Sequence, residues 1–366
     1  MNQKINLLAL GAVFCVASAS HASVVYSAQE LGNLGGVGTD GLQVNAFDLN
    51  DRGQVVGAAY VNTPFGVKYH AFLTGENGVG LIDIGKQINA GNSAAYAVNH
   101  LGQVTGAFNM GAAGSGEAYI SSANGLGYTP LFASGSFSRG SDINDAGQVT
   151  GFNSLQGTQK AFVTGGNGTA PVVLGNGWGV SINQPGQVVA ASNNAMFADA
   201  GSSTLVSLGF ESLPGGASSK GVDAINDNAL AVGWVGALHY AFVYDIKTHT
   251  KVADIGNIGS PIVADDGMDI NNAGIVVGRD SSSGNAQAFI WGLNGAVKQN
   301  LNDLVSLPTG VYLTSARGIN DLGQIVANAS DGKAYLLSPV PEPSTGLLMV
   351  AGVVGIGIAC QKRKSV

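Results

Sequence analysis

The stretch DINDAGQVTG, residues 142–151, decides the fold of this chain. An Asx side chain bonds to nearby backbone and Gly accepts a positive φ, so Asn-Asp-x-Gly is typical of a tight turn. The β-branched run after the turn favours a strand. The stretch therefore predicts a hairpin, in which one strand ends near Asn144 and the next carries the run that begins at Val149.

The same phrase occurs seven times: an apolar residue, Asn, two variable residues, Gly or a substitute, and a short β-branched run. The seven anchors are Asn50, Asn99, Asn144, Asn183, Asn226, Asn271 and Asn320. Consecutive anchors lie 49, 45, 39, 43, 45 and 49 residues apart. A period of roughly 45 residues indicates a propeller or a solenoid rather than two ordinary domains.

Each copy carries two further strand signals after the hairpin. A third strand is marked by Ala beside an aromatic residue, as in Ala71-Phe72. A fourth strand leads into a Gly-rich bend, as in the Asp-Ile-Gly of residues 83–85. Four strands per copy is the content of a propeller blade.

The phase of the repeat predicts a closed ring. Residues 24–36 resemble a fourth strand with its bend, whereas the seventh copy stops after its third strand at residues 334–337. The N-terminal strand can therefore complete the last blade and hide the sheet edges that an open array would leave free. We predict an all-β, seven-bladed β-propeller of four-stranded repeats over residues 23–338.

The composition excludes some classes of partner. The chain is 45% hydrophobic and 11% charged, and its formal net charge is −7. Removal of Lys4 and of Lys362, Arg363 and Lys364 would take four positive charges away and leave −11. An acidic surface disfavours nucleic acid, whose phosphates need Lys and Arg. No pattern in the sequence indicates a cofactor.

Residues 1–22 have the pattern of a secretory signal peptide. Lys4 precedes an apolar stretch over residues 5–17, and the small-residue pattern before Ser23 predicts cleavage after Ala22. The only cysteine outside this segment is Cys360, so we expect no disulfide in the exported domain despite an oxidising destination.

The C-terminal residues 339–366 change character abruptly. Pro-Glu-Pro is followed by an apolar run at residues 346–360, which predicts a single, rather short transmembrane segment. The basic end predicts that the large domain lies outside the cell. The residues that form the motif are Val340, Pro341, Glu342, Pro343, Ser344, Lys362, Arg363 and Lys364.

This three-part tail resembles the PEP-CTERM sorting signal of Gram-negative bacteria. The resemblance implies export, a transient membrane anchor, and recognition by a cysteine transpeptidase of the exosortase type. It also implies a final place in the cell envelope, at the cell surface or in the extracellular matrix. A plain one-span anchor is the alternative.

The repeats resemble the extracellular HAF repeat family through three phrases. These are Tyr-His-Ala-Phe-Leu at residues 69–73, Leu-Gly-x-Leu-Gly-Gly at residues 31–36, and the Ile-Asn-Asp-x-Gly-Gln-Val hairpin at residues 143–149. The resemblance implies an exported repeat protein and transfers no activity. The His-Ala-Phe triplet is complete only at His70, which argues against a repeated metal or catalytic histidine.

Three copies carry part of a calcium-loop pattern. Asp48 and Asn50, Asp142 and Asn144, and Asp269 and Asn271 stand at its first and third positions, and Gly follows at the sixth. The fifth-position oxygen ligand is missing in all three copies. The pattern favours turn formation, with weak calcium binding as the alternative that a chelator-sensitive melting temperature would reveal.

Signals for catalysis are few, and we predict no catalytic residue. The Gly-x-Gly-x-x-Gly at residues 36–41 precedes an expected strand rather than the helix that would hold a pyrophosphate. Gly-x-Ser-x-Gly is absent from the sequence. The imidazole bases outside the leader are His70, His100, His239 and His249. Carboxylates that a ring could bring together are Asp40, Asp223, Asp265, Asp266 and Asp269.

Variable connections are the better place for a binding surface, because a rigid ring displays them on its faces. Aromatic or soft side chains in or near such segments are Tyr60, Phe65, Phe108, Met110, Phe152, Trp178 and Trp234. We expect a non-catalytic scaffold or binding module. The alternatives are a carbohydrate-active hydrolase or lyase on a propeller, and an adhesin that binds polysaccharide through loop aromatics.

Overall fold

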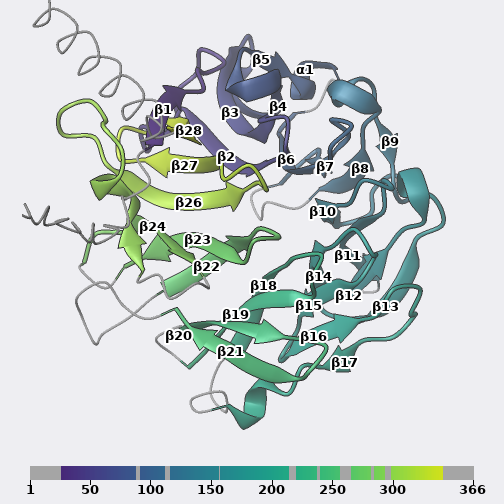
Figure 1. Ribbon diagram of the computed structural model, residues 1–366. Helices are drawn as coiled ribbons and strands as arrows, with labels where there is room; N and C mark the ends of the chain where they lie inside the picture. Colours follow the sequence, from purple (N-terminus) through teal and green to yellow (C-terminus); the bar gives the residue numbers. More distant parts are fainter. Residues whose placement is uncertain are drawn as a thin grey trace, which may run out of the picture.

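The strands form seven sheets of four, arranged around a central axis (Figure 1). The computed structural model describes residues 26–87, 91–111, 116–155, 157–213, 220–236, 240–255, 265–281, 284–292 and 298–340. Within these residues the fold is the predicted all-β, seven-bladed propeller. The repeat count therefore equals the blade count.

In six blades the four strands follow one another along the chain. Blade 1 contains β2 (Val44–Leu49), β3 (Val55–Thr63), β4 (Gly66–Thr74) and β5 (Leu81–Asp83). Blade 2 contains β6 (Ser93–Val98), β7 (Val104–Phe108), β8 (Glu117–Ile120) and β9 (Thr129–Pro130). Blade 3 contains β10 (Ser138–Ile143), β11 (Val149–Leu155), β12 (Thr158–Val163) and β13 (Val172–Asn176).

The next blades repeat this order. Blade 4 contains β14 (Trp178–Ile182), β15 (Val188–Ala191), β16 (Ala195–Ala198) and β17 (Val206–Ser207). Blade 5 contains β18 (Lys220–Ile225), β19 (Leu230–Val235), β20 (Tyr240–Asp245) and β21 (Thr250–Asp254). Blade 6 contains β22 (Asp265–Ile270), β23 (Ile275–Asp280), β24 (Gln287–Gly292) and β25 (Gln299–Asn300).

The helices are single turns in the connections. They are η1 (Glu76–Gly78), α1 (Ile84–Gln87), η2 (Ala123–Gly125), η3 (Gly166–Gly168), η4 (Phe210–Ser212) and η5 (Leu301–Asp303).

Blade 7 closes the ring with strands from both ends of the domain. It contains β26 (Leu313–Ile319), β27 (Ile325–Ala329), β28 (Ala334–Pro339) and the N-terminal β1 (Tyr26–Glu30). β1 lies beside β28 (Figure 1). The two strands pair antiparallel, with Tyr26 opposite Pro339. The predicted closure is confirmed. The strand itself ends at Glu30, so the Leu-Gly segment of residues 31–36 is only the bend that follows it.

The small residue beside the aromatic one in each third strand is explained by packing between blades. In β4, Phe72 packs with Leu336 of blade 7, whereas Ala71 and Leu73 pack with residues of blade 2. Successive side chains of a strand point to opposite faces, so each third strand serves both neighbouring blades. Gly57 leaves room for this packing, because a Cβ there would lie 2.8 Å from Phe72 Cε1.

The two ends of the central channel receive different parts of each blade. The first strands of the blades line the channel and run towards the Asn anchors, so all seven Asn turns lie at one end. β28 runs in the same direction as β26, because both pair antiparallel with β27. Tyr26 and Pro339 therefore also lie at the Asn end, where Gln324 Nε2 donates to Ser338 Oγ at 3.2 Å. The β3–β4 hairpin tip lies at the opposite end.

The described part of the chain holds no helix that is long and apolar enough to span a membrane. The predicted leader, its cleavage site at Ala22 and Ser23, and the apolar segment 346–360 lie outside the described residues. Of the sorting motif only Val340 is described, and it is exposed.

Candidate functional site

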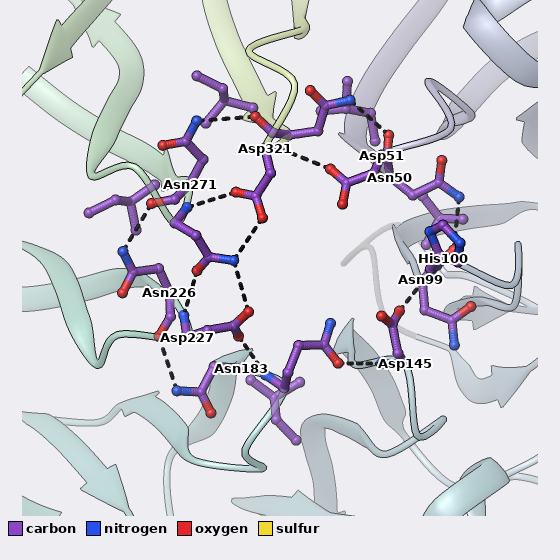
Figure 2. A pocket seen from close by; sticks show the side chains of 18 of the residues that line it. Asn50, Asp51, Asn99, His100, Asp145, Asn183, Asn226, Asp227, Asn271 and Asp321 are labelled. Carbon is purple, nitrogen blue, oxygen red and sulfur yellow. Dashed lines mark hydrogen bonds between the residues drawn. The ribbon is translucent and has the colours of Figure 1, made fainter.

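A ring of hydrogen bonds joins the seven blades at the Asn end (Figure 2). The Nδ2 of each anchor Asn donates to the backbone carbonyl of the anchor in the next blade. The donor and acceptor pairs are Asn50–Asn99, Asn99–Asn144, Asn144–Asn183, Asn183–Asn226, Asn226–Asn271, Asn271–Asn320 and Asn320–Asn50, at 2.8–3.1 Å. All seven anchors are buried. We call this end of the channel the closed end.

Each anchor also holds its own turn. Asn50 Oδ1 accepts from the backbone N–H of Arg52 and of Gln54, and Asn144 Oδ1 accepts from the N–H of Gln148. Asn271 Oδ1 accepts from the N–H of Ile275. The amide oxygens in the three calcium-like loops are thus already hydrogen-bonded within the hairpin. Calcium binding there stays an untested prediction.

A second layer of hydrogen bonds lies beside the ring. The backbone N–H of the residue after an anchor donates to the corresponding side chain one blade further on. Six such bonds run His100–Asp145, Asp145–Gln184, Gln184–Asp227, Asp227–Asn272, Asn272–Asp321 and Asp321–Asp51, at 2.8–2.9 Å. Both layers line a cavity of about 170 Å³. Their polar atoms are largely occupied by neighbouring blades, so this end is built mainly as a closure.

Deeper in the channel, three carboxylates tie blades together. Asp48 Oδ2 accepts from the N–H of Val98 at 2.9 Å, which links blade 1 to blade 2. Asp142 Oδ2 accepts from Ile182 N, and Asp269 Oδ2 accepts from Ile319 N, both at 2.8 Å. The other oxygen of each carboxylate accepts from the N–H of the following residue. These side chains therefore act as inter-blade clamps.

Burial raises the pKa of all three clamps above the usual range of Asp. The pKa of Asp269 reaches about 7, because burial outweighs the backbone N–H donors that favour the charged form. The pKa of Asp48 is raised first by burial and then by the charges of Asp142 and Asp269. Burial likewise raises the pKa of Asp142. Because Asp269 gains a proton near pH 7, the channel carries less negative charge at neutral pH than its carboxylates alone would indicate.

The structure brings together some of the predicted chemical residues and separates others. Asp223 and Asp269 line the same stretch of channel, a cavity of about 150 Å³. Asp40 is exposed and accepts from the N–H of Leu42, while Asp265 and Asp266 belong to β22. Within the described ranges, no cluster of three His, Cys, Asp or Glu side chains could hold a metal ion.

The histidines are dispersed. His70 is buried in β4 and its Nδ1 lies 2.9 Å from Asp83 Oδ1, whereas His100 lies at the closed end. His249 occupies an exposed turn with a φ of 54°, and His239 lies outside the described residues. The Gly-rich residues 36–41 lead into β2 and not into a helix, as the sequence predicted.

The predicted binding aromatics divide into packed and exposed residues. Phe108 and Phe152 are buried, and Phe108 makes edge contacts with Tyr119 and Tyr128. Phe65 is 90% exposed at the β3–β4 hairpin tip, and Trp178 is 40% exposed at the start of β14. The remaining three are Tyr60, whose ring packs at a tilt against that of Tyr69, and the partly buried Met110 and Trp234.

Trp178 belongs to a pocket at the end opposite the Asn ring, which we call the open end. Tyr96, Arg139, Ser141 and Val180 complete its wall around a cavity of about 160 Å³. Sequence reasoning missed Tyr96, Arg139 and Ser141. Their signal was their place three to five residues before an anchor, because the residues there line the channel and differ from copy to copy.

Comparison with known proteins identifies the tail and the fold. Residues 339–364 match the PEP-CTERM protein-sorting motif. This motif implies export and association with the cell surface or a membrane. No curated protein matches the chain.

Among solved structures, the chain is similar to a catalytically inactive virginiamycin B lyase from Staphylococcus aureus with quinupristin. The identity is 10% and the TM-score 0.53, over 86% of this chain and 100% of that one. It is also similar to the β-propeller domain of the Trilobed protease from Pyrococcus furiosus, which has an open velcro topology. Here the identity is 8% and the TM-score 0.52, over 81% and 92% of the two chains. At such identities the likeness shows the propeller fold alone, so the chain is placed by its fold and by its sorting motif.

Proposed function

We propose that this protein is an exported, non-catalytic binding module that is held at the cell surface with the open end of its channel facing outward. The observation that carries the proposal is the position of the two ends of the propeller. β1 begins and β28 ends at the same end of the molecule as the Asn ring, and the sorting motif starts at residue 339. A membrane segment after β28 would therefore hold the closed end towards the membrane and leave the open end free.

The occupancy of the carboxylates supports a binding role over catalysis. Both oxygens of Asp48, Asp142 and Asp269 accept backbone N–H groups, which fixes the blades to one another. A general acid or base must instead reach the proton that it transfers.

We further propose the repeat family, the processing of the tail and the ligand from the resemblances in the sequence. The repeats would be HAF repeats, and the tail would be processed by an exosortase-type enzyme in a Gram-negative envelope after a transient stay of residues 346–360 in the membrane. The ligand would be an extracellular polysaccharide. Contact through exposed loop aromatics such as Phe65 would make the protein an adhesin.

Cysteine labelling on intact cells tests the proposal. Phe65→Cys marks the open end and Leu322→Cys, in an exposed turn beside the ring, marks the closed end. Both are made in a Cys360→Ser background and exposed to a membrane-impermeant maleimide. We expect both cysteines to react. In the cell-attached protein the cysteine of Phe65→Cys should be labelled faster than that of Leu322→Cys, and the two labelling rates should become closer once the protein is released from the cell. Labelling that requires cell lysis would contradict surface display.

The intact mass of each cell fraction provides the second measurement. A species that ends near Pro341 to Ser344 outside the cell would support sorting. A full-length species confined to the inner membrane would contradict it.

A hydrolase or lyase is the second candidate, because Asp223 and Asp269 share the channel and the pKa of Asp269 reaches about 7, as a general acid needs. Incubation of the protein with polysaccharide should then release new chain ends, and Asp269→Asn should stop the release. If no new chain ends are released from acidic or neutral polysaccharides, the hydrolase or lyase is rejected and the binding module is the remaining candidate.

A further inference from the structure

Arg139 is a cation without an anion. Its guanidinium carbon lies 4.8 Å from the centroid of Tyr96 and 5.6 Å from that of Phe152. Among the residues that the structure describes, none forms a hydrogen bond or an ion pair with this side chain, and its Nε is buried without a partner. By contrast, the Nζ of the buried Lys298 forms an ion pair with Asp280 Oδ2 at 2.9 Å.

Removing a charge from water costs free energy unless the charge is paired, so a partly buried Arg without an ion-pair partner needs an explanation. Aromatic contact offsets some of this cost, yet leaves the planar N–H donors free. Arg is the side chain best suited to bind a carboxylate through two parallel hydrogen bonds. Arg139 therefore has the chemistry of a residue that receives its anion from a ligand.

The surroundings of Arg139 restrict what that ligand can be. Trp178 presents a 40% exposed indole to the pocket, and Ser141 Oγ is buried without a partner in the described residues. Arg139 is the one cation among the described residues of the pocket wall, and a single guanidinium matches one carboxylate better than an anion of several charges such as a phosphate ester. One cation, one free hydroxyl and one flat apolar surface fit a ligand with a single carboxylate, hydroxyl groups and an apolar ring face.

We propose that this pocket binds a carboxylated sugar residue, a hexuronic acid unit of an acidic polysaccharide. The sugar carboxylate pairs with the Arg139 guanidinium, a ring hydroxyl bonds to Ser141 Oγ, and the C–H face of the ring packs on the Trp178 indole. This inference rests on the proposed binding function and names the ligand class of the open end.

Calorimetric titration of the full-length protein in detergent tests this inference, with trigalacturonate and maltotriose as the acidic and neutral probes. We expect trigalacturonate to bind and maltotriose to bind at least tenfold more weakly. Arg139→Gln should weaken trigalacturonate binding at least tenfold and abolish the preference for the acid. Arg139→Lys keeps the charge but cannot form two parallel hydrogen bonds to a carboxylate, so its affinity for trigalacturonate should fall several-fold.

Two controls separate the pocket from general charge and from misfolding. Arg52→Gln removes the same charge at the closed end, where Arg52 pairs with Glu76, and should leave binding unchanged. Trp178→Phe keeps a flat ring and should retain most of the affinity while it removes any ligand-induced quenching of tryptophan fluorescence. An unchanged melting temperature shows that each variant is folded.

Three outcomes would overturn the inference: no binding of trigalacturonate at millimolar concentration, equal binding of both probes, or equal losses in Arg139→Gln and Arg52→Gln. Surface labelling of Phe65→Cys is independent of these titrations. A protein that is displayed at the surface but does not bind trigalacturonate would therefore refute the ligand class alone. A protein that binds trigalacturonate but stays inside the cell would refute the proposed display alone.

Discussion

The closed end and the open end of the channel are built from the same seven strands, but only the closed end repeats. Every blade supplies the same Asn to the closed ring, and that Asn makes the same two kinds of hydrogen bond. A few residues earlier on the same strands, blade 2 supplies Tyr96, blade 3 Arg139 and blade 4 Trp178. Identity between copies therefore holds the ring together, whereas variation between copies makes a pocket.

Removal of one Asn from the ring should have the largest effect on stability. Asn226→Ala should lower the free energy of unfolding by about 3 kcal/mol, because the backbone N–H of Leu230 loses its acceptor and the buried carbonyl of Asn271 loses its inter-blade donor. That carbonyl keeps one donor, the N–H of Gly274 within its own turn. Chemical denaturation measures the loss. Asn62→Ala, which deletes an exposed amide that bonds to Gly35, is the control and should change stability by less than about 0.5 kcal/mol.

Asn226→Asp refines this experiment. It keeps an oxygen for the turn but places a second oxygen against the carbonyl of Asn271, so it should be at least as damaging as the Ala variant at neutral pH. A stability equal to that of the native protein would show that the inter-blade bond contributes nothing.

The clamps between the two ends should respond to pH. Below about pH 4, where Asp269 is protonated in both states, its raised pKa contributes its full stabilisation, and this is lost as the pH rises through the folded value of about 7. Stability should therefore fall over that window, and Asp269→Asn should make the slope shallower by up to about 1.4 kcal/mol per pH unit. Denaturation at several pH values gives both slopes. Equal slopes would mean that the N–H donors keep this carboxylate charged.

Two blades already contain a milder change at the closed end. In blades 1 to 4 and 7 the Asn amide also donates to a Gln four residues later, whereas blades 5 and 6 carry Leu230 and Ile275 there. Gln148→Leu should therefore cost only about 1 kcal/mol, because one neutral hydrogen bond, from Asn144 Nδ2, is lost and the ring remains. A loss as large as that of Asn226→Ala would show that Gln is part of the ring.

The closed end was only half predictable from the sequence. The turn at each anchor could be predicted because Asn and Gly act on backbone within four residues. The ring could not, because the acceptor of Asn50 Nδ2 is the carbonyl of Asn99, and only the closed propeller brings the two together. Closure itself was predictable from the phase of the repeat, since the missing strand and the spare strand have matching patterns.

The open end was less predictable for the same reason. Tyr96, Arg139 and Trp178 lie in three different copies, and no local pattern relates them. Phe152 looked like a candidate for ligand binding, but it packs inside the blade and supports the guanidinium of Arg139 instead. Whether an aromatic residue of one copy is exposed depends on the neighbouring blade, which sequence periodicity does not specify.

The smallest expected effect belongs to the open end. Arg139→Gln should change the free energy of unfolding by less than about 0.5 kcal/mol, because the lost cation–π contacts are offset by the removal of a desolvated, unpaired charge. The same variant should lose most of its affinity for trigalacturonate. Asn226→Ala should instead lose mainly free energy of unfolding. Parallel denaturation and titration of the two variants would thus separate a residue kept for binding from one kept for folding. If Arg139→Gln unfolds as readily as Asn226→Ala, the guanidinium is part of the scaffold, and the division between a structural and a functional end fails.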